Sequence, residues 1–206
     1  MCTRFFIDES QRELAYIISL AVKSPLTDRF IHQGHPLMTR GEIRPTNVVP
    51  VIAPTPSGKT SVYPMKWGFT DNEHGNLIYN ARSESAGYKP MFTDLWTSHR
   101  CVIPTSYYCE WQHYTGADGR TRIGDKYIVQ TVNSEITWLC GLYRIENDFP
   151  VFVVLTREPC SELAEIHERM PVIISGDRIS DWVSPEKNPA ETMQYALTDV
   201  IIEQAG

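Results

Sequence analysis

The residues with the most distinctive chemistry stand at the start of the chain, which begins Met1-Cys2-Thr3-Arg4. Removal of Met1 would make Cys2 the N-terminal residue, with an α-amine and a thiol on neighbouring carbons. The amine condenses with an aldehyde to a Schiff base, and the thiol can then close on the imine carbon to give a five-membered thiazolidine. Cys2 therefore indicates covalent capture of an aldehyde or nucleophilic attack by the thiol. Because a cysteine also arises here by chance, the prediction depends on the rest of the chain.

Four further segments carry polar side chains in arrangements that could support catalysis. They are residues 44–50 (Arg-Pro-Thr-Asn-Val-Val-Pro), 67–69 (Trp-Gly-Phe) with 79–84 (Tyr-Asn-Ala-Arg-Ser-Glu), 109–111 (Cys-Glu-Trp) and 165–171 (Glu-Ile-His-Glu-Arg-Met-Pro). Each has a simple structural explanation when taken singly. Asn80 suits a turn, Glu110 a strand end at the surface, and His167 the C-terminus of a helix beside its dipole. Their common order along one chain is what favours a functional interpretation.

The composition of the chain limits the classes of protein to which it can belong. The chain has 206 residues, of which 42% are hydrophobic and 21% are charged, as expected for a single globular domain over residues 1–206. No apolar run approaches 18 residues and the N-terminus lacks the pattern of a secretory signal, so we expect no membrane span and a cytoplasmic location. The five cysteines show no CxxC spacing, which predicts a reducing compartment and no cysteine-rich metal site.

The net charge of −6 and a pI near 5.5 are unusual for a protein that binds nucleic acid. This balance argues against tight nonspecific binding to duplex DNA. It leaves room for a local basic cleft, because binding depends on where the charges gather.

Apolar periodicity and turn signals predict short helices around a strand-rich middle. Helices are expected from a capping box at residues 10–13 up to Ser24-Pro25, and over 84–98, 159–167 and 177–183; strands are expected over 48–53, 61–69, 101–103, 107–112, 126–132, 137–143, 151–156 and 172–174. Residues 24–41 are predicted to be loop, and residues 115–119 a hairpin turn. This order is typical of an α+β fold with antiparallel pairing, since regular βαβ alternation is missing.

Taken together, the motifs resemble those of the SRAP family, the SOS response-associated peptidase proteins. The similarity includes the Met-Cys-x-Arg start, a Trp-Gly strand, Asn-Ala-Arg, Glu-Trp after an aromatic strand, and His-x-Arg-Met-Pro, and it runs from residue 2 to about residue 174. The resemblance implies a single compact α+β domain with a distorted antiparallel barrel-like sheet flanked by helices. It also implies an abasic-site DNA–protein cross-linking enzyme of the DNA damage response.

The resemblance assigns roles to particular residues of this chain. Cys2 matches the cysteine that cross-links abasic sites in single-stranded DNA, Asn80 the residue that orients it and the opened sugar, Glu110 the contact to the α-amine, and His167 the residue beside the reacting sugar carbon. Further positions match groups that contact or line the path of the DNA: Arg4, Pro50, Arg82, Trp111, Thr156 and Arg169. The implied partner is single-stranded DNA bound by a monomer, with no metal or organic cofactor.

Elementary acid–base chemistry adds to these assignments. Opening the cyclic sugar to an aldehyde needs proton transfer, which His167 with an ordinary pKa of about 6.5 could perform near neutrality. Glu110 could accept a proton from the α-amine, whose ordinary pKa is about 8. Asn80 could donate a hydrogen bond without adding charge.

Several departures from the family pattern leave alternatives open. Thr3 stands where the family has glycine, residues 70–76 form a short and partly acidic loop, and no family-like strand is recognisable over residues 195–206. One alternative is a cysteine-type autopeptidase that removes Met1, with possible lyase-type activity on DNA. Another is a degenerate member that binds single-stranded DNA without reacting. The preferred DNA junction and the effect of Thr3 are not fixed by the sequence.

Overall fold

A five-stranded barrel lies at the centre of the molecule, as seen in a computed structural model that describes residues 2–71 and 74–205. Its strands are β3 (Val48–Pro54), β4 (Thr60–Trp67), β8 (Arg100–Thr105), β11 (Thr137–Glu146) and β12 (Phe149–Arg157). The ring closes because β12 pairs with both β4 and β11. The β12–β4 pair is parallel, whereas β4–β3, β3–β8, β8–β11 and β11–β12 are antiparallel. The predicted α+β fold with a barrel-like sheet is confirmed, and its closing pair is parallel.

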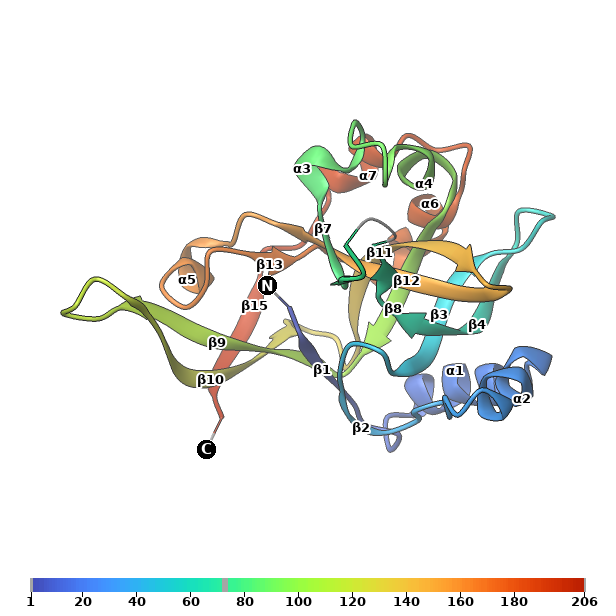
Figure 1. Cartoon of the computed structure of the whole chain (residues 1–206), viewed down its shortest axis with the longest axis horizontal. Helices are drawn as coiled ribbons and strands as arrows, with labels where there is room; N and C mark the ends of the chain where they lie inside the picture. Colours follow the sequence, from blue (N-terminus) through green and yellow to red (C-terminus); the bar gives the residue numbers. More distant parts are fainter. Residues whose placement is uncertain (1, 72–73, 206) are drawn as a thin grey trace.

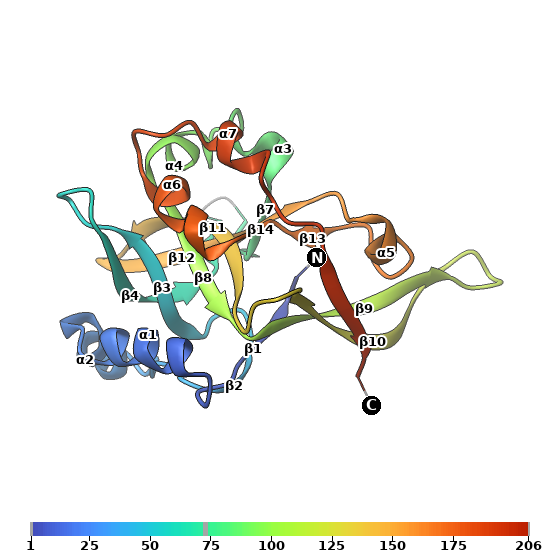
Figure 2. The same cartoon turned by 180° about the vertical axis from the view of Figure 1, so that it is seen from behind.

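A second sheet extends from the barrel and carries the N-terminus. Its order is β15 (Val200–Gln204), β10 (Thr121–Thr131), β9 (Tyr107–Thr115), β1 (Arg4–Ile7) and β2 (Gly41–Ile43). The hairpin of β9 and β10 reaches well away from the barrel (Figures 1 and 2). Antiparallel register places Arg4 of β1 opposite Cys109 of β9. This register brings the start of the chain beside the Glu110 segment.

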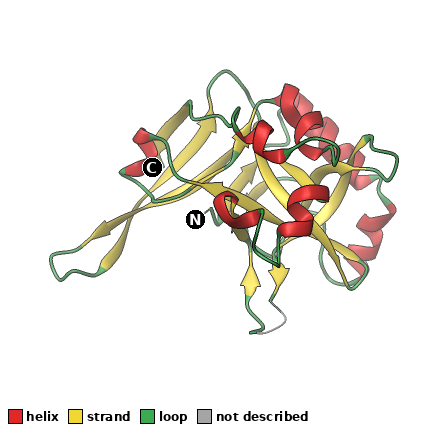
Figure 3. Ribbon diagram, turned by 90° about the horizontal axis from the view of Figure 1, so that it is seen from above, coloured by secondary structure: helices red, strands yellow, loops and turns green. Residues whose placement is uncertain are grey.

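Helices cover the barrel in two groups. The first comprises α1 (Arg12–Val22) and α2 (Pro25–His32), which lie together on one side; the second comprises α3 (Ser83–Ala86), α4 (Thr93–Ser98), α6 (Ile179–Val183) and α7 (Pro189–Met193) (Figure 1). A short helix, α5 (Ser161–Ala164), lies apart from both groups, toward the β9–β10 hairpin, as also seen from above (Figure 3). The remaining short elements are β5 (Phe69–Thr70), β6 (Leu77–Ile78), β7 (Asn80–Arg82), β13 (Met170–Pro171), β14 (Ile173–Ile174) and the 3₁₀ turn Gly176–Arg178.

The prediction of a loop over residues 24–41 is wrong for residues 25–32, which form α2, whereas residues 33–40 belong to no helix or strand. The Ser24 hydroxyl accepts a hydrogen bond from the backbone N–H of Leu26, and Pro25 occupies the first turn, where its missing N–H costs nothing. At α1 the predicted capping box does not form, since the N-cap residue is Gln11 and no side chain caps it. The same Ser-Pro pair therefore ends one helix and starts the next.

Two other predictions are corrected near the functional segments. The single helix expected over residues 84–98 is split into α3 and α4, with Gly87 and Pro90 between them, both poor residues for a helix interior. A strand does form in the C-terminal segment, as β15, and it pairs with β10 from Val200–Thr131 to Gln204–Tyr127.

An aromatic cluster ties the barrel core to the segment that precedes the Asn-Ala-Arg motif. The ring of Trp67 lies 5.0 Å from that of Phe5 and 6.1 Å from that of Phe152, and its side chain is fully buried. Its indole N–H donates to the carbonyl of Tyr79 at 2.8 Å. Gly68 follows with φ of +120°, where any Cβ would come within 2.6 Å of Leu77. The Trp-Gly motif thus fixes the entry to β7 through packing.

Candidate active site

Asn80 positions Cys2 through a hydrogen bond. The side-chain amide of Asn80 donates a hydrogen bond to the Cys2 carbonyl at 2.8 Å. Asn80 begins β7, which pairs in parallel with β12 through Val154, so its position is set by the barrel. Cys2 itself is fully buried, and its Sγ donates weakly to the carbonyl of Arg4 at 3.6 Å. The contact between Asn80 and Cys2 links residues that are 78 positions apart in the sequence.

Glu110 and His167 meet beside this N-terminal segment. Glu110 lies in β9, and His167 lies between α5 and β13. The segment before His167 is attached to β9, since the backbone N–H of His113 donates to the carbonyl of Ile166 at 2.8 Å. His167 Nε2 and Glu110 Oε1 are 3.9 Å apart, and both side chains are almost completely buried. The rings of His113 and His167 pack with centroids 4.5 Å apart.

Burial moves the pKa values of the two groups in opposite directions. It raises the pKa of Glu110 to about 7 and lowers the pKa of His167 to about 4. It also raises the pKa of the Cys2 thiol far above its usual range, with the charge of Glu110 adding to the effect. The prediction that His167 titrates near neutrality is therefore wrong for this structure. Glu110 is the group whose protonation changes near pH 7.

The tautomer of neutral His167 is set by its neighbour in the chain. Its Nδ1 accepts a hydrogen bond from the backbone N–H of Arg169 at 3.0 Å, so the ring proton is on Nε2, the nitrogen nearer Glu110. His167 can thus donate a hydrogen bond on the side where Glu110 lies.

A cavity of about 390 Å³ opens at this place. It is lined by Thr3, Arg4, Tyr79, Glu110, Trp111, His113, Ile123 and His167. Four of these, Arg4, Glu110, Trp111 and His167, are site residues predicted from the sequence, whereas Tyr79, His113 and Ile123 are not among the predicted residues. Only the pairing of β9 with β10, which sets Ile123 opposite His113, brings Ile123 here. Thr3 also lines the cavity, so the residue that departs from the family glycine is at the site itself.

The residues predicted to contact DNA fall into two groups. Arg4 and Trp111 line the cavity, while Arg82 is exposed and lines a neighbouring cavity of about 910 Å³ together with Asn80, Lys89 and Arg144 among others. Pro50 and Thr156 are buried: Pro50 pairs with Pro64 across β3 and β4, and the Thr156 hydroxyl donates to the carbonyl of Ala81 at 3.3 Å. These two support strands around the site.

Arg169 forms an ion pair with Glu84. Its guanidinium donates to both carboxylate oxygens of Glu84, at 2.9 and 2.7 Å, and to the carbonyl of Thr156 at 2.7 Å. A bidentate pair of this kind fixes the orientation of both partners. Arg169 therefore connects the His167 segment to α3 and β12, and a contact with phosphate would require Glu84 to be displaced.

Within residues 2–71 and 74–205, no group of three or more His, Cys, Asp and Glu side chains is arranged to hold a metal ion. In the same part of the chain, no helix combines the length and the apolar composition needed to cross a bilayer. The segment 70–76 lies partly outside the described residues.

This fold and this N-terminal site define a member of the SRAP family. The family model described as SOS response associated peptidase (SRAP) matches residues 1–204, so the chain belongs to that family.

Relatives of known name are similar over most of the chain. "Abasic site processing protein YoaM" of Bacillus subtilis is 28% identical over 173 residues, which cover 77% of this chain and 74% of that protein. "Abasic site processing protein YedK" of Escherichia coli is 22% identical over 147 residues, covering 67% of this chain and 62% of that one. A solved structure from Bacteroides thetaiotaomicron has a TM-score of 0.72 at 18% identity, covering all of this chain and 92% of the other. The last similarity supports the fold.

Proposed function

We propose that this protein processes abasic sites in single-stranded DNA by covalent capture at Cys2, after Met1 has been removed. The hydrogen bond from Asn80 to the Cys2 carbonyl carries the proposal, because it directs the N-terminal segment to the cavity lined by Glu110 and His167. The relatives named as abasic site processing proteins support abasic sites as the substrate.

Capture of the sugar proceeds in two steps. The α-amine of Cys2 adds to the C1 aldehyde of the opened sugar and water leaves, which joins nitrogen and C1 by a double bond. The sulfur then bonds to C1, the electron pair of the double bond moves to nitrogen, and the thiol proton is transferred through Glu110 to that nitrogen. The product is a thiazolidine.

Glu110 is the general acid and base in this scheme. The thiol stays protonated because burial raises its pKa, so its proton must leave as the carbon–sulfur bond forms. A carboxyl group with a pKa near 7 is available in both forms at neutral pH and suits proton transfer in both directions. His167 is neutral and donates from Nε2 to an oxygen of the sugar, which favours ring opening.

Removal of Met1 by the protein itself is a second candidate function, favoured by the position of Glu110 next to Cys2. It would provide the free amine that capture needs. The buried, protonated thiol argues against a thiolate attack of the cysteine-protease type, so in this candidate Glu110 would have to assist the thiol.

Intact-mass measurement after mixing the purified protein with abasic single-stranded DNA tests the proposal. We expect loss of the mass of Met1 and a heat-stable adduct with the DNA, formed without borohydride. Undamaged DNA of the same sequence should give no adduct. Cys2→Ala keeps the amine and loses the thiol, so borohydride should trap an imine but no stable adduct should form. A heat-stable adduct of this variant, or reversible binding alone in the wild type, would refute capture as described.

A further inference from the structure

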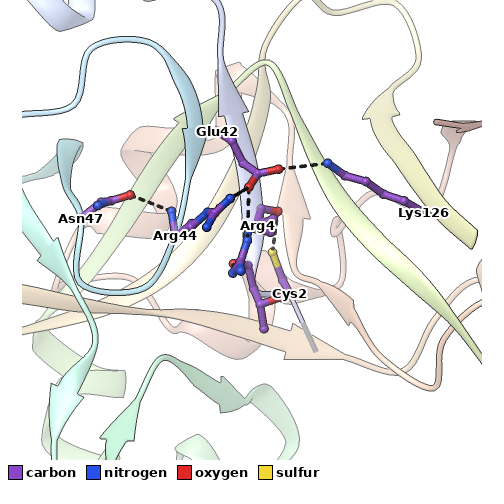
Figure 4. A network of polar contacts seen from close by, with 7 residues as sticks. Cys2, Arg4, Glu42, Arg44, Asn47 and Lys126 are labelled. Carbon is purple, nitrogen blue, oxygen red and sulfur yellow. Dashed lines mark hydrogen bonds and ion pairs between the residues drawn. The ribbon is translucent and has the colours of Figure 1, made fainter. Parts of the chain in front are cut away.

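Three cationic side chains converge on one carboxylate at the rim of the reactive cavity. Glu42 of β2 forms ion pairs with Arg44 at 2.8 Å, with Lys126 of β10 at 3.0 Å and with Arg4 of β1 at 3.4 Å. Figure 4 shows Arg4, Arg44 and Lys126 approaching the Glu42 carboxylate, with Cys2 beside Arg4. We call these four residues the Glu42 cluster.

The cluster carries more positive charge than its carboxylate can balance. Three cations around one anion leave a local charge of about +2 on a protein whose net charge is −6. Other exposed ion pairs of the described residues, such as Arg40–Glu9 and Arg122–Asp118, join one cation to one acid, and Arg178 lies near two acids, Asp177 and Asp181. All four side chains of the cluster remain partly exposed, so the surplus charge faces solvent where an anion can approach.

The backbone holds Arg44 in place before any ligand binds. The Asn47 side chain accepts a hydrogen bond from the Arg44 N–H at 2.9 Å, and Thr46 between them has φ of 79°. A β-branched residue rarely adopts this left-handed conformation, and strained positions of this kind are typical of functional segments. The loop is therefore preorganised at a local energetic cost.

The Glu42 cluster adjoins the reactive cavity, and this position indicates which anion it binds. Arg4 lines the cavity itself, and the Lys126 ammonium lies 5.4 Å from the centroid of the Trp111 ring, which lines it too. The strand register sets Lys126 opposite Trp111. An extended polyanion whose reacting unit enters the cavity would thus place its next charged group on the cluster.

We propose that the Glu42 cluster is a phosphate seat that binds the phosphodiester adjacent to the captured nucleotide of a single DNA strand, with Arg44 and Lys126 as its outer cations. This inference rests on the proposed function for the identity of the strand. Glu42 keeps the three cations at one point, and the Lys126–Trp111 contact presents the indole as a face on which the neighbouring base stacks.

Salt dependence of binding to undamaged single-stranded DNA tests the seat. Each cation that contacts phosphate contributes about 0.7 to the slope of log K against log salt concentration. We expect Arg44→Gln and Lys126→Gln each to reduce the slope by about 0.7, and the double variant by about 1.4. Lys126→Arg keeps the charge and should retain the wild-type slope.

Matched controls remove the same charges on the far side of the molecule. Lys59→Gln, in the turn between β3 and β4, and Arg29→Gln, on α2, should leave the slope unchanged. Figure 1 shows α2 and the β3–β4 turn on the opposite side of the barrel from the β9–β10 hairpin. An unchanged slope in the folded double variant would overturn the seat, and so would an equal loss in the controls.

The salt-slope test of the phosphate seat and the adduct test of capture can succeed or fail independently. If the wild type forms no adduct with abasic DNA while the slopes change as stated, the proposed capture fails and the phosphate seat stands. If adducts form and the slopes do not change, the seat is wrong and capture stands.

Discussion

At the scale of single residues, Glu110 decides the pH dependence of the reaction. Its carboxylate form is the base that takes the thiol proton, and its pKa is raised to about 7 by burial. The rate of adduct formation should therefore rise with pH through about 7 in the wild type. In Glu110→Gln we expect a much slower reaction whose remaining rise follows the α-amine, with an ordinary pKa of about 8.

Single-turnover rates over pH 5–9 with abasic single-stranded DNA would measure this. Asp118→Asn in the β9–β10 turn removes an exposed carboxylate and serves as the control, with a wild-type profile expected. A Glu110→Gln profile that keeps the inflection near 7 would assign that titration to another group.

At the scale of elements, Arg169 connects the His167 segment to α3 and to β12. Because its guanidinium binds Glu84 and the Thr156 carbonyl, we expect Arg169→Ala to lower the free energy of unfolding by about 2 kcal/mol. Adduct formation should slow through displacement of His167, while the salt slope for undamaged DNA stays at the wild-type value. Denaturant unfolding and salt titration of the same variant distinguish this supporting role from phosphate binding, which would reduce the slope by about 0.7.

The elements also show what the sequence could predict. Mostly apolar runs such as residues 137–143 and 151–156 predicted strands correctly, because nearly all of their side chains are buried and a run of this kind is visible in the local sequence. The short helices were harder to predict from the sequence. Ser24-Pro25 can mark the end of one helix or the start of another, and the structure shows that it does both, between α1 and α2. Ring closure through β12 depends on pairing between distant segments, which no local pattern records.

The same distinction applies to the site. Cys2, Asn80, Glu110 and His167 could be named because each lies within a motif that resembles the family. Glu42 and Lys126 lie outside those motifs and are 84 residues apart, so only the order of strands β10, β9, β1 and β2 brings them together. The lowered pKa of His167 is caused mainly by its burial in the folded chain, which the local sequence does not reveal.

At the scale of the whole molecule, the site trades stability for reactivity. The folded pKa of Glu110, about 7, lies above its ordinary value, so the folded state binds the proton more tightly than the unfolded chain. Stability from this group is present at low pH and is lost as the pH rises from about 4.5 to about 7. Ionised Glu110 then costs up to about 3 kcal/mol at pH 8.

Glu110→Gln removes that cost. We expect the variant to exceed the wild type in free energy of unfolding at pH 8 and to differ little at pH 5, as measured by urea unfolding at both values. Equal stability of the two proteins at pH 8 would show that the carboxylate is well solvated in the folded state.

The central claim is that the N-terminal cysteine closes a ring with the sugar of an abasic site. The most direct measurement is peptide mapping of the isolated adduct after nuclease and protease digestion. We expect a peptide that begins at Cys2, lacks Met1 and carries the sugar remnant on both nitrogen and sulfur. This adduct should survive hydroxylamine, which would release an open imine. An unmodified Cys2 peptide, or a remnant attached to another residue, would contradict it.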